Sequence, residues 1–557
     1  MRKSEWTEIK KKYKIYSTKK YNQIKRTYST PRDFEDAVDA NTYFMLICYL
    51  EKTFKVADEL ALSLKPSLKQ SLERCIWAVQ TLLKKNENDG NTIIGASKLA
   101  RMLYDTYPEL MPFVKDAVNH PMFHFDNTKN RISLSKTWKN EKTIADTIKE
   151  KLKSPEDSEM NWQDYKKIED IELTDEQVSL LKAINENNIV MLNGCAGSGK
   201  TTVVKALVKM LDDNAYRYTL LAPTGIAAKR LRQTTGKHAK TIHMHLACLD
   251  TVDDFLIIDE CSMIGVNLLG SLFSTLNSDV KIVLICDEAQ LASISCGNIV
   301  QDIIDSNIIP IINLTKIFRY GIGGIETVAT DIRNGKPLEE NENERYNDYT
   351  FIPISSNPVN DVLITYKNVL KNYNPEDIMI LSPFNVRMAG TYILNSAIQK
   401  EYNDNPTFFS YKKQGIEIEF KIGDRIINTE NNYHMQGEYG DISIMNGDIG
   451  KIIKFDGENT IVEFDSGIAI LDKNDMVKML LANAISVHKS QGNQAKCVIV
   501  VLDSSHGFFL NRNIEYVAVS RAQEKLIVIG DIDTINNAMK IQQEKNRETN
   551  LKNMLLL

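Results

Sequence analysis

The stretch that most constrains the fold is 187–204, where an apolar run leads into a glycine-rich loop and then an amphipathic segment. Ile189–Leu192 is typical of a buried strand, and the apolar spacing after residue 201 is typical of a helix. Between them, Gly194–Thr201 reads Gly-Cys-Ala-Gly-Ser-Gly-Lys-Thr and fits the pattern G-x-x-x-x-G-K-[ST]. That loop between a strand and a helix identifies a phosphate-binding site. The sequence therefore predicts an α/β domain that binds a nucleoside triphosphate.

Each part of this loop has a chemical reason. Glycines let backbone N–H groups turn inward around a phosphate, and the positive end of the following helix adds to the attraction. We expect Lys200 to reach the β- and γ-phosphates and the Thr201 hydroxyl to hold Mg²⁺. ATP and Mg²⁺ are therefore the predicted cofactors. The loop residues predicted to bind the nucleotide are Gly194, Cys195, Ala196, Gly197, Ser198, Gly199, Lys200, Thr201 and Thr202.

Two carboxylates follow a second apolar run, Phe255–Ile258. In triphosphate hydrolases, a carboxylate at such a strand end helps to hold the metal. We expect Asp259 to coordinate Mg²⁺ together with Thr201, and Glu260 to polarise the attacking water. Apolar runs at 218–221 and 280–285 alternate with helical patterns. This alternation predicts a parallel sheet.

Composition sets further limits. A chain of 557 residues predicts about three or four domains. It has no apolar run of the ~18 residues that a membrane span needs, and no apolar core of a secretory signal near its start. The eight cysteines lack Cys-x-x-Cys spacing, which fits a reducing cytoplasm and argues against a zinc site. The net charge of −5 decides little, since a nucleic-acid groove needs only local basic charge.

The N-terminal region is predicted to be mainly helical. Its first 32 residues carry eleven lysines and arginines with four interleaved tyrosines, which fits either a single-strand binding surface or a solvated tail. Helical spacing follows over 33–120, and a hairpin is predicted over 122–134. This arrangement fits a winged helix or a helical accessory domain of unknown use. A polar stretch at Ser154–Ser158 predicts a linker.

The helix before the phosphate loop contains a glutamine with two interpretations. Thr174 and Gln177 fit a capping box that opens a helix. Gln177 is also placed to read the edge of an adenine. Spacing alone favours the cap.

Eight segments occur in the order typical of superfamily 1 helicases, and the chain most closely resembles the RecD-like, 5′→3′ branch. They are Gly194–Thr201, Ala222–Leu231, Thr241–His243, Asp259–Met263, Asp287–Ser293, Leu314–Arg319, Ile485–Gly492 and Tyr516–Ala522. The resemblance covers about residues 170–535. It implies two RecA-like parallel-sheet domains with a nucleotide between them.

The resemblance also assigns roles to single residues. It makes Gln177 the adenine-reading glutamine, against the preference from spacing. It implies that Arg319 and Arg521 reach the γ-phosphate from the second RecA-like domain and that Gln290 senses the phosphate. The implied catalytic set is Lys200, Glu260, Gln290, Arg319 and Arg521. The implied DNA contacts are Pro223, Thr224, His243, His488 and Lys489.

Short alternating strands between about 405 and 480 resemble the SH3-like insertion of the RecD-like branch. In the UvrD-like, 3′→5′ branch the corresponding insertion is helical. The polar stretch 335–360 is predicted to be a loop. The expected domains are a helical N-terminal region 1–153, RecA-like domain 154–318, the first part of a second RecA-like domain 319–404, the insertion 405–480, and the rest of the second RecA-like domain 481–557.

Three positions depart from the family pattern. Gly492-Asn493-Gln494 stands where an acidic residue is usual, and Ser486 replaces a threonine. Only nine residues, Leu246–Asp254, connect the His243 segment to the next strand. At about 3.3–3.6 Å per residue they form a tight turn rather than a strand-separating pin. The wedge is therefore either minimal or supplied elsewhere, and residues 1–153 are then the candidate.

Together these features predict an ATP-dependent 5′→3′ DNA helicase or translocase, in the cytoplasm, without DNA cleavage. Its expected partners are single-stranded DNA, duplex junctions and proteins that bind residues 1–153, with no membrane. Two alternatives stay open: an RNA helicase of the same superfamily, and a nucleotide-switched binding platform with little unwinding. Strand-stimulated ATP hydrolysis with DNA and with RNA distinguishes the three.

Overall fold

The computed structural model describes residues 2–153, 160–248, 250, 252–318, 323–339, 346–507, 509–542 and 546–557. These divide into two compact units. Unit 1 contains Met1–Thr143, Ile294–Gly297 and Arg547–Met554, and unit 2 contains Ile144–Ser293, Asn298–Asn546 and Leu555–Leu557. The predicted linker Ser154–Ser158 and Arg319 lie outside the described residues. The bounds of the five segments stay predictions.

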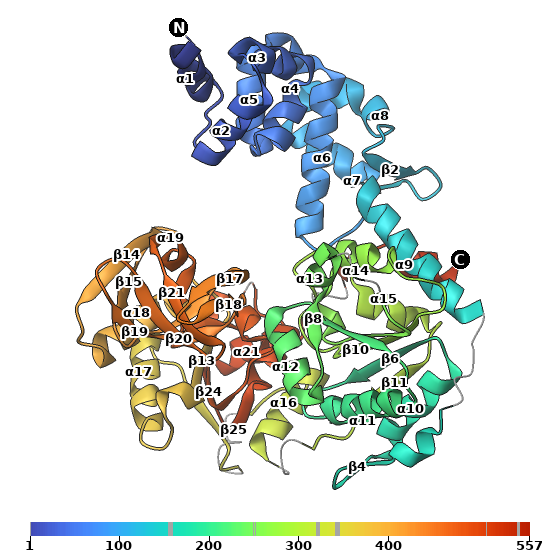
Figure 1. The fold of residues 1–557 in the computed structure, drawn as a ribbon, viewed down its shortest axis with the longest axis vertical. Coiled ribbons are helices and arrows are strands. Elements are labelled where there is room, and N and C mark those ends of the chain that lie inside the picture. Colours follow the sequence, from blue (N-terminus) through green and yellow to red (C-terminus); the bar gives the residue numbers. More distant parts are fainter. Residues whose placement is uncertain are drawn as a thin grey trace. The chain divides into compact units, whose positions relative to one another are not determined.

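Unit 1 is mainly helical, as predicted, and is drawn in blue in Figure 1. Its helices pack around a core that includes Phe34, Tyr43 and Trp77. They are α1 (Arg2–Lys12), α2 (Thr18–Thr27), α3 (Pro31–Ala40), α4 (Thr42–Phe44), α5 (Phe54–Leu64), α6 (Leu72–Asn88), α7 (Ala96–Thr106), α8 (Val114–Ala117) and the start of α9 (Ser135–Lys153). The predicted hairpin is confirmed as antiparallel β2 (Phe123–Asp126) and β3 (Arg131–Leu134), with β1 (Ile94–Gly95) beside β3. A winged helix stays a prediction.

Two distant segments complete unit 1. The Gly297 N–H donates to the Gly90 carbonyl at 2.9 Å, and the Thr92 N–H donates to the Glu548 carbonyl at 2.9 Å. Glu141 accepts from the Asn550 N–H at 2.9 Å, and its burial raises the pKa of its carboxyl to about 7. The segment after Ser293 and the last residues of the chain thus belong to the helical unit, which nothing in the sequence indicated.

The first sheet of unit 2 is parallel throughout, as predicted. Its strand order is β11-β6-β10-β9-β7-β8. The strands are β6 (Ile189–Gly194), β7 (Tyr218–Ala222), β8 (Ala239–Thr241), β9 (Phe255–Ile258), β10 (Lys281–Cys286) and β11 (Ile311–Leu314). Figure 1 shows α10 (Asp175–Glu186) and α11 (Lys200–Asp213) on one face, and α13 (Ile242–Cys248), α14 (Val266–Phe273) and α15 (Ile299–Ser306) on the other. Helix α12 (Gly225–Thr235) follows β7.

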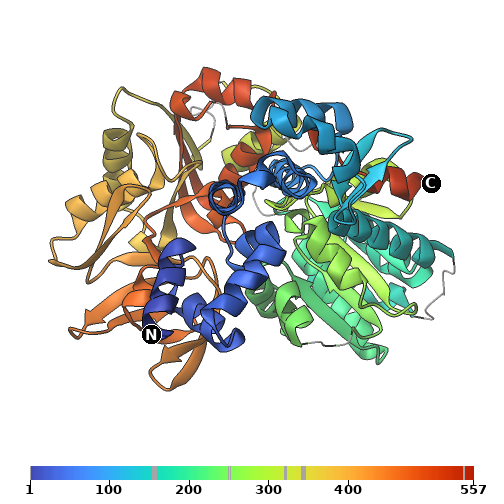
Figure 2. The ribbon, with the colours of Figure 1, turned by 90° about the horizontal axis from the view of Figure 1, so that it is seen from above.

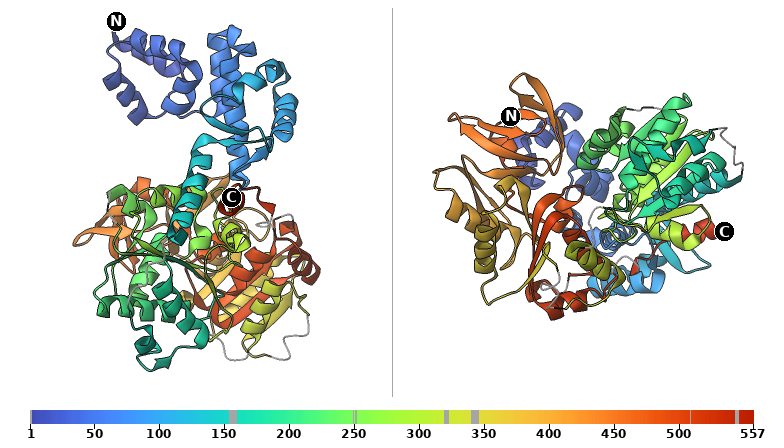
Figure 3. Two further views of the ribbon diagram at one scale, coloured as in Figure 1. Left: turned by 90° about the vertical axis from the view of Figure 1, so that its right-hand side faces the viewer. Right: turned by 90° about the horizontal axis from the view of Figure 1, so that it is seen from below.

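The second sheet of unit 2 is also parallel, in the order β12-β25-β24-β13-β23 (Figure 3, right). The strands are β12 (Tyr349–Pro353), β13 (Ile378–Ser382), β23 (Ala484–Ser486), β24 (Ala495–Leu502) and β25 (Ala522–Gly530). The helices are α16 (Gly324–Asn334), α17 (Pro358–Val369), α18 (Thr391–Tyr402), α20 (Arg512–Val519) and α21 (Ile532–Ala538).

The predicted loop at 335–360 is wrong for its second half. Residues 349–353 form edge strand β12, because alternate side chains Tyr349 and Phe351 are buried while the strand pairs with β25. Helix α17 then begins at Pro358. The charged residues before the strand masked this short apolar alternation in the sequence.

The β-rich insertion lies between α18 and β23 and forms antiparallel sheets. Figure 2 shows its orange strands gathered in one body. One sheet has the order β18-β17-β21-β20-β19-β16-β22, and β14 pairs with β15 alone. The strands are β14 (Thr407–Lys413), β15 (Ile416–Lys421), β16 (Arg425–Asn428), β17 (Asn432–Gly437), β18 (Gly440–Ile444), β19 (Ile449–Phe455), β20 (Thr460–Phe464), β21 (Gly467–Leu471) and β22 (Met479–Leu481), with α19 (Lys473–Met476) before β22. The predicted strands are confirmed, and an SH3-like topology stays a prediction.

None of the helices within the described ranges combines the length and the apolar character that crossing a membrane requires.

Candidate nucleotide and nucleic-acid site

The phosphate loop forms a tight cradle at the carboxyl end of β6. Gly197 and Gly199 have φ angles of +85° and +81°, a conformation that side-chain-bearing residues rarely adopt. A Cβ on Gly199 would lie 2.3 Å from Gln177 Nε2. The Ser198 hydroxyl donates to the Cys195 carbonyl at 2.9 Å and holds the turn. Glycine is therefore the residue best suited to these positions, where the backbone must wrap an anion.

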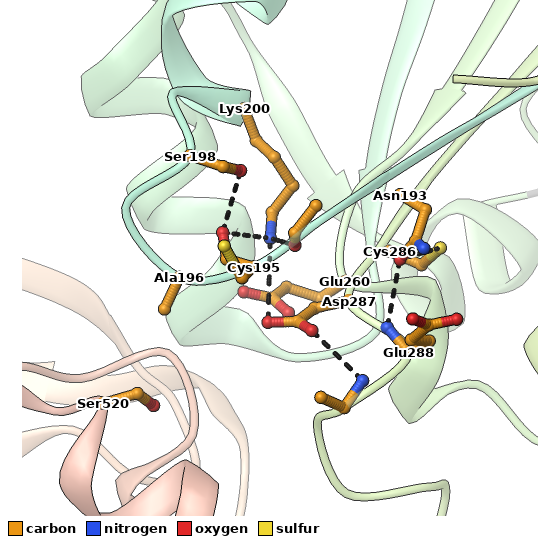
Figure 4. Close-up of polar contacts among 12 residues, drawn as sticks. Asn193, Cys195, Ala196, Ser198, Lys200, Glu260, Cys286, Asp287, Glu288 and Ser520 are labelled. Carbon is orange, nitrogen blue, oxygen red and sulfur yellow. Dashed lines mark hydrogen bonds and ion pairs between the residues drawn. The ribbon is translucent and has the colours of Figure 1, made fainter. Parts of the chain in front are cut away.

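Lys200 points back into this cradle (Figure 4). Its ammonium donates to the carbonyls of Gly194 and Cys195, the latter at 3.3 Å. It also lies 4.0 Å from Asp287 Oδ2, at the end of β10. The cation therefore stands where a phosphate would meet it, held by weak partners that a stronger anion would replace.

Two further carboxylates stand at the end of β9. Glu260 has a φ of +54°, and its N–H donates to Asp259 Oδ1 at 2.8 Å. Burial and the neighbouring Glu260 carboxylate raise the pKa of Asp259 to about 6. Such strain in a non-glycine residue is typical of functional sites. A hydroxyl from Thr201 and these carboxylates are the hard oxygen ligands that Mg²⁺ prefers, so the residues fit the predicted metal.

A cavity of about 290 Å³ brings most of the predicted site together. Asp259 and Glu260 line it together with the loop, and so do Gln290 from the segment after β10 and Arg521 from the segment after α20. The predicted residues that line it are Cys195, Ala196, Gly197, Gly199, Lys200, Thr201, Thr202, Asp259, Glu260, Gln290 and Arg521. Gly194 and Ser198 lie behind this lining, within the loop itself. Arg230, Phe318 and Gln494 also line the cavity and were not predicted.

The structure confirms the capping interpretation of Gln177, and its reading of an adenine stays a prediction. Its Oε1 accepts from the Thr174 N–H at 3.0 Å, which completes the capping box. Its Nε2 donates to the Gly199 carbonyl at 3.3 Å, so the same side chain supports the phosphate loop. The Phe318 ring beside Gly199 is 55% exposed, and its N–H donates to the Gly197 carbonyl at 2.8 Å. An exposed ring at this point offers a stacking face, and its place just before Arg319 was the signal that could have found it.

Two residues of the second sheet's helix α20 also contact the segment after β10. Asn513 Nδ2 donates to the carbonyls of Ala289 and Gln290, at 3.2 and 3.1 Å. The Tyr516 hydroxyl bonds to Asp287. Arg521 follows α20 and is 3% exposed, with its Nε donating to the Val517 carbonyl at 3.0 Å. The sequence predicted Arg521 but not Asn513 or Tyr516.

The predicted DNA contacts follow the carboxyl ends of parallel strands. Pro223 and Thr224 follow β7 and His243 follows its neighbour β8 in the first sheet, so the three share one edge. His488 and Lys489 follow β23 in the short helix Val487–Ser490. Burial and the nearby Lys413 lower the pKa of Lys489 to about 8. Within the described ranges, Lys489 has no carboxylate partner, as expected of a cation that awaits an anion.

Two protein-family models match parts of the chain that form the two parallel sheets. Residues 172–356 match the model of an AAA domain, and residues 481–529 match a UvrD-like helicase C-terminal domain. The ATP-dependent RecD2 DNA helicase of Deinococcus radiodurans is 27% identical over 464 residues, covering 80% of this chain and 62% of that protein. The RecBCD enzyme subunit RecD of Mycolicibacterium smegmatis is 25% identical over 438 residues, covering 68% and 75%. By sequence, this chain is similar to RecD-like helicases of superfamily 1.

The RecD-like chain spans less than two thirds of the Deinococcus relative's length. A crystal structure of Bacteroides Pif1 bound to single-stranded DNA has a TM-score of 0.43 and 21% identity, covering 67% of this chain and 94% of that one.

Proposed function

We propose that this RecD-like chain is an ATP-dependent helicase that moves 5′→3′ along single-stranded DNA. One observation carries the proposal: a single cavity joins the phosphate loop and acidic pair of the first sheet to Arg521 of the second. A site built from two sheets can change their spacing when its occupant changes. Repeated change of this kind is what a motor needs.

The residues have distinct tasks in hydrolysis. ATP, bound with Mg²⁺, is the substrate, and the bond to its γ-phosphate is the one that is broken. Thr201 and Asp259 would hold the metal, and Lys200 would neutralise charge on the phosphates. Glu260 accepts a proton from the attacking water and orients it. Gln290 and the arginines Arg521 and Arg319 stabilise charge at the γ-phosphate end, the role of Arg319 resting on the family resemblance.

The remaining residues contact the adenine base of the nucleotide and the nucleic-acid strand. Gln177 and the exposed face of Phe318 meet the adenine beside the loop. Pro223, Thr224, His243, His488 and Lys489 contact the backbone of the strand. Residues 1–153 supply the wedge at duplex junctions and a surface for protein partners. The cytoplasm is the expected location.

The test compares substrates. ATP hydrolysis by the full chain is measured with single-stranded DNA and with RNA of the same sequence, and unwinding is measured on duplexes with a 5′ or a 3′ tail. We expect stimulation by DNA and unwinding only from the 5′ tail. Stimulation by RNA alone would favour the RNA helicase, unwinding only from the 3′ tail would favour the UvrD-like branch, and no stimulation would favour the binding platform.

A further inference from the structure

Helix α20, which packs beside the second sheet, is hydrogen-bonded to the segment that follows β10. Asn513 and Tyr516 are three residues apart, so they share one face of the helix. Asn513 holds the backbone of that segment at Ala289 and Gln290, and Tyr516 holds the side chain of Asp287. The helix therefore contacts both ends of the turn Asp287–Gln290.

The Tyr516 hydroxyl makes two directed hydrogen bonds. It accepts from the Ala196 N–H of the phosphate loop at 3.0 Å and donates to Asp287 Oδ2 at 3.0 Å. Because the Ala196 N–H can only donate and a carboxylate can only accept, the hydroxyl proton points at Asp287. The tyrosine is 2% exposed, and solvent does not compete for either bond.

Asp287 is shared between this hydroxyl and the catalytic lysine. Its Oδ1 accepts from the Ala289 N–H at 3.1 Å, within its own turn. Its Oδ2 meets Tyr516 at 3.0 Å but Lys200 Nζ only at 4.0 Å. Arg333, the other nearby cation, lies 3.5 Å from Glu288, which partly engages it.

We propose that Tyr516 is a positioning residue for nucleotide binding: its hydroxyl holds Asp287 so that the Lys200 ammonium stays available to the triphosphate. The inference rests on the proposed nucleotide site. Asp287 is fully buried, so without its donor the carboxylate must find another. Lys200 is the adjacent cation, and an ion pair that closes in a buried site is strong. A triphosphate would then have to break that pair before it could bind.

The test is a double-mutant cycle on the full chain. Binding of a fluorescent, non-hydrolysable ATP analogue with Mg²⁺ is measured for the wild type, Tyr516→Phe, Asp287→Asn and the double variant. We expect Tyr516→Phe to weaken binding about tenfold with Asp287 present, the size of one hydrogen bond to a charged group. In the D287N background, where the charge that traps Lys200 is absent, the same change should weaken binding less than twofold.

Equal weakening in both backgrounds, or none in either, would overturn the proposal, because a purely structural hydroxyl acts regardless of the charge on Asp287. Tyr366→Phe, at another buried tyrosine of the second domain, is the matched control and should leave binding unchanged. If Tyr516→Phe lowers the melting temperature, recovery of binding in the double variant still supports the proposal, and no recovery refutes it. A wild-type chain that does not bind the analogue would refute the nucleotide site itself.

Discussion

The two parallel sheets of unit 2 make unequal contributions to one cavity. In the first sheet the phosphate loop follows β6, and the carboxylates follow the neighbouring strands β9 and β10. In the second sheet β13 is followed by Pro383-Phe384-Asn385, without a glycine-rich loop or a lysine. Its contribution comes from α20, from Arg521 after that helix and from Gln494 before β24. The first sheet thus carries a binding site of its own. The second sheet completes that site only because it lies close to the first.

The largest expected effect tests the first sheet. Lys200→Ala should abolish ATP hydrolysis, because it removes the cation that faces the phosphates inside the cradle. Steady-state ATPase with saturating single-stranded DNA measures it. Lys209→Ala is the matched control, since Lys209 lies on the same helix with its side chain exposed. Turnover of Lys200→Ala within tenfold of the control would remove Lys200 from the catalytic role.

The next effect tests the second sheet. Arg521→Ala should slow ATP hydrolysis by roughly 10³-fold, the lower end of the range for arginines that stabilise a transferring phosphoryl group. Binding of the ATP analogue and of single-stranded DNA should change little, because the first sheet holds the nucleotide. Glu260→Gln is the companion variant and should likewise bind the analogue without hydrolysing it. If Arg521→Ala instead loses analogue binding and keeps its turnover rate, the division of labour between the sheets is wrong.

The contrast between the sheets also explains what the sequence could predict. Gly194–Thr201 is a continuous segment whose neighbours fix its geometry, so its place at a strand end followed directly. The apolar runs before Asp259 and Asp287 likewise predicted β9 and β10. Alternating side chains predicted strands β15, β16, β19 and β20 of the insertion. These features depend on local periodicity, which the sequence carries.

Other features depend on contacts between segments that lie far apart in the sequence. Tyr516 reads as an ordinary apolar position of a helix until the structure places Ala196 and Asp287 beside its hydroxyl. Edge strand β12 was missed because five residues between polar stretches carry little periodic signal. Arg547–Met554 joins unit 1 through backbone hydrogen bonds to residues near Thr92, and backbone bonds leave no mark in side-chain pattern.

The smallest effect concerns the strand-binding side of the second sheet. With its pKa lowered to about 8, Lys489 is charged at pH 7 and mostly neutral at pH 9. A neutral amine no longer displaces a counterion from a phosphate, so affinity for single-stranded DNA should fall as the pH rises. The slope of log K against log salt should become shallower by about 0.7, the value for one phosphate contact on a single strand. Fluorescence anisotropy over a salt series at both pH values measures it.

Lys489→Arg gives this prediction its control, because a guanidinium stays charged throughout the range. The variant should keep the pH 7 slope at pH 9. Burial also lowers the pKa of His488, which moves the titration of that ring further below the range from pH 7 to pH 9. Lys473→Arg, at an exposed lysine of the insertion, should retain the wild-type pH dependence. Equal slopes for the wild type at pH 7 and pH 9 would mean that Lys489 does not contact the strand.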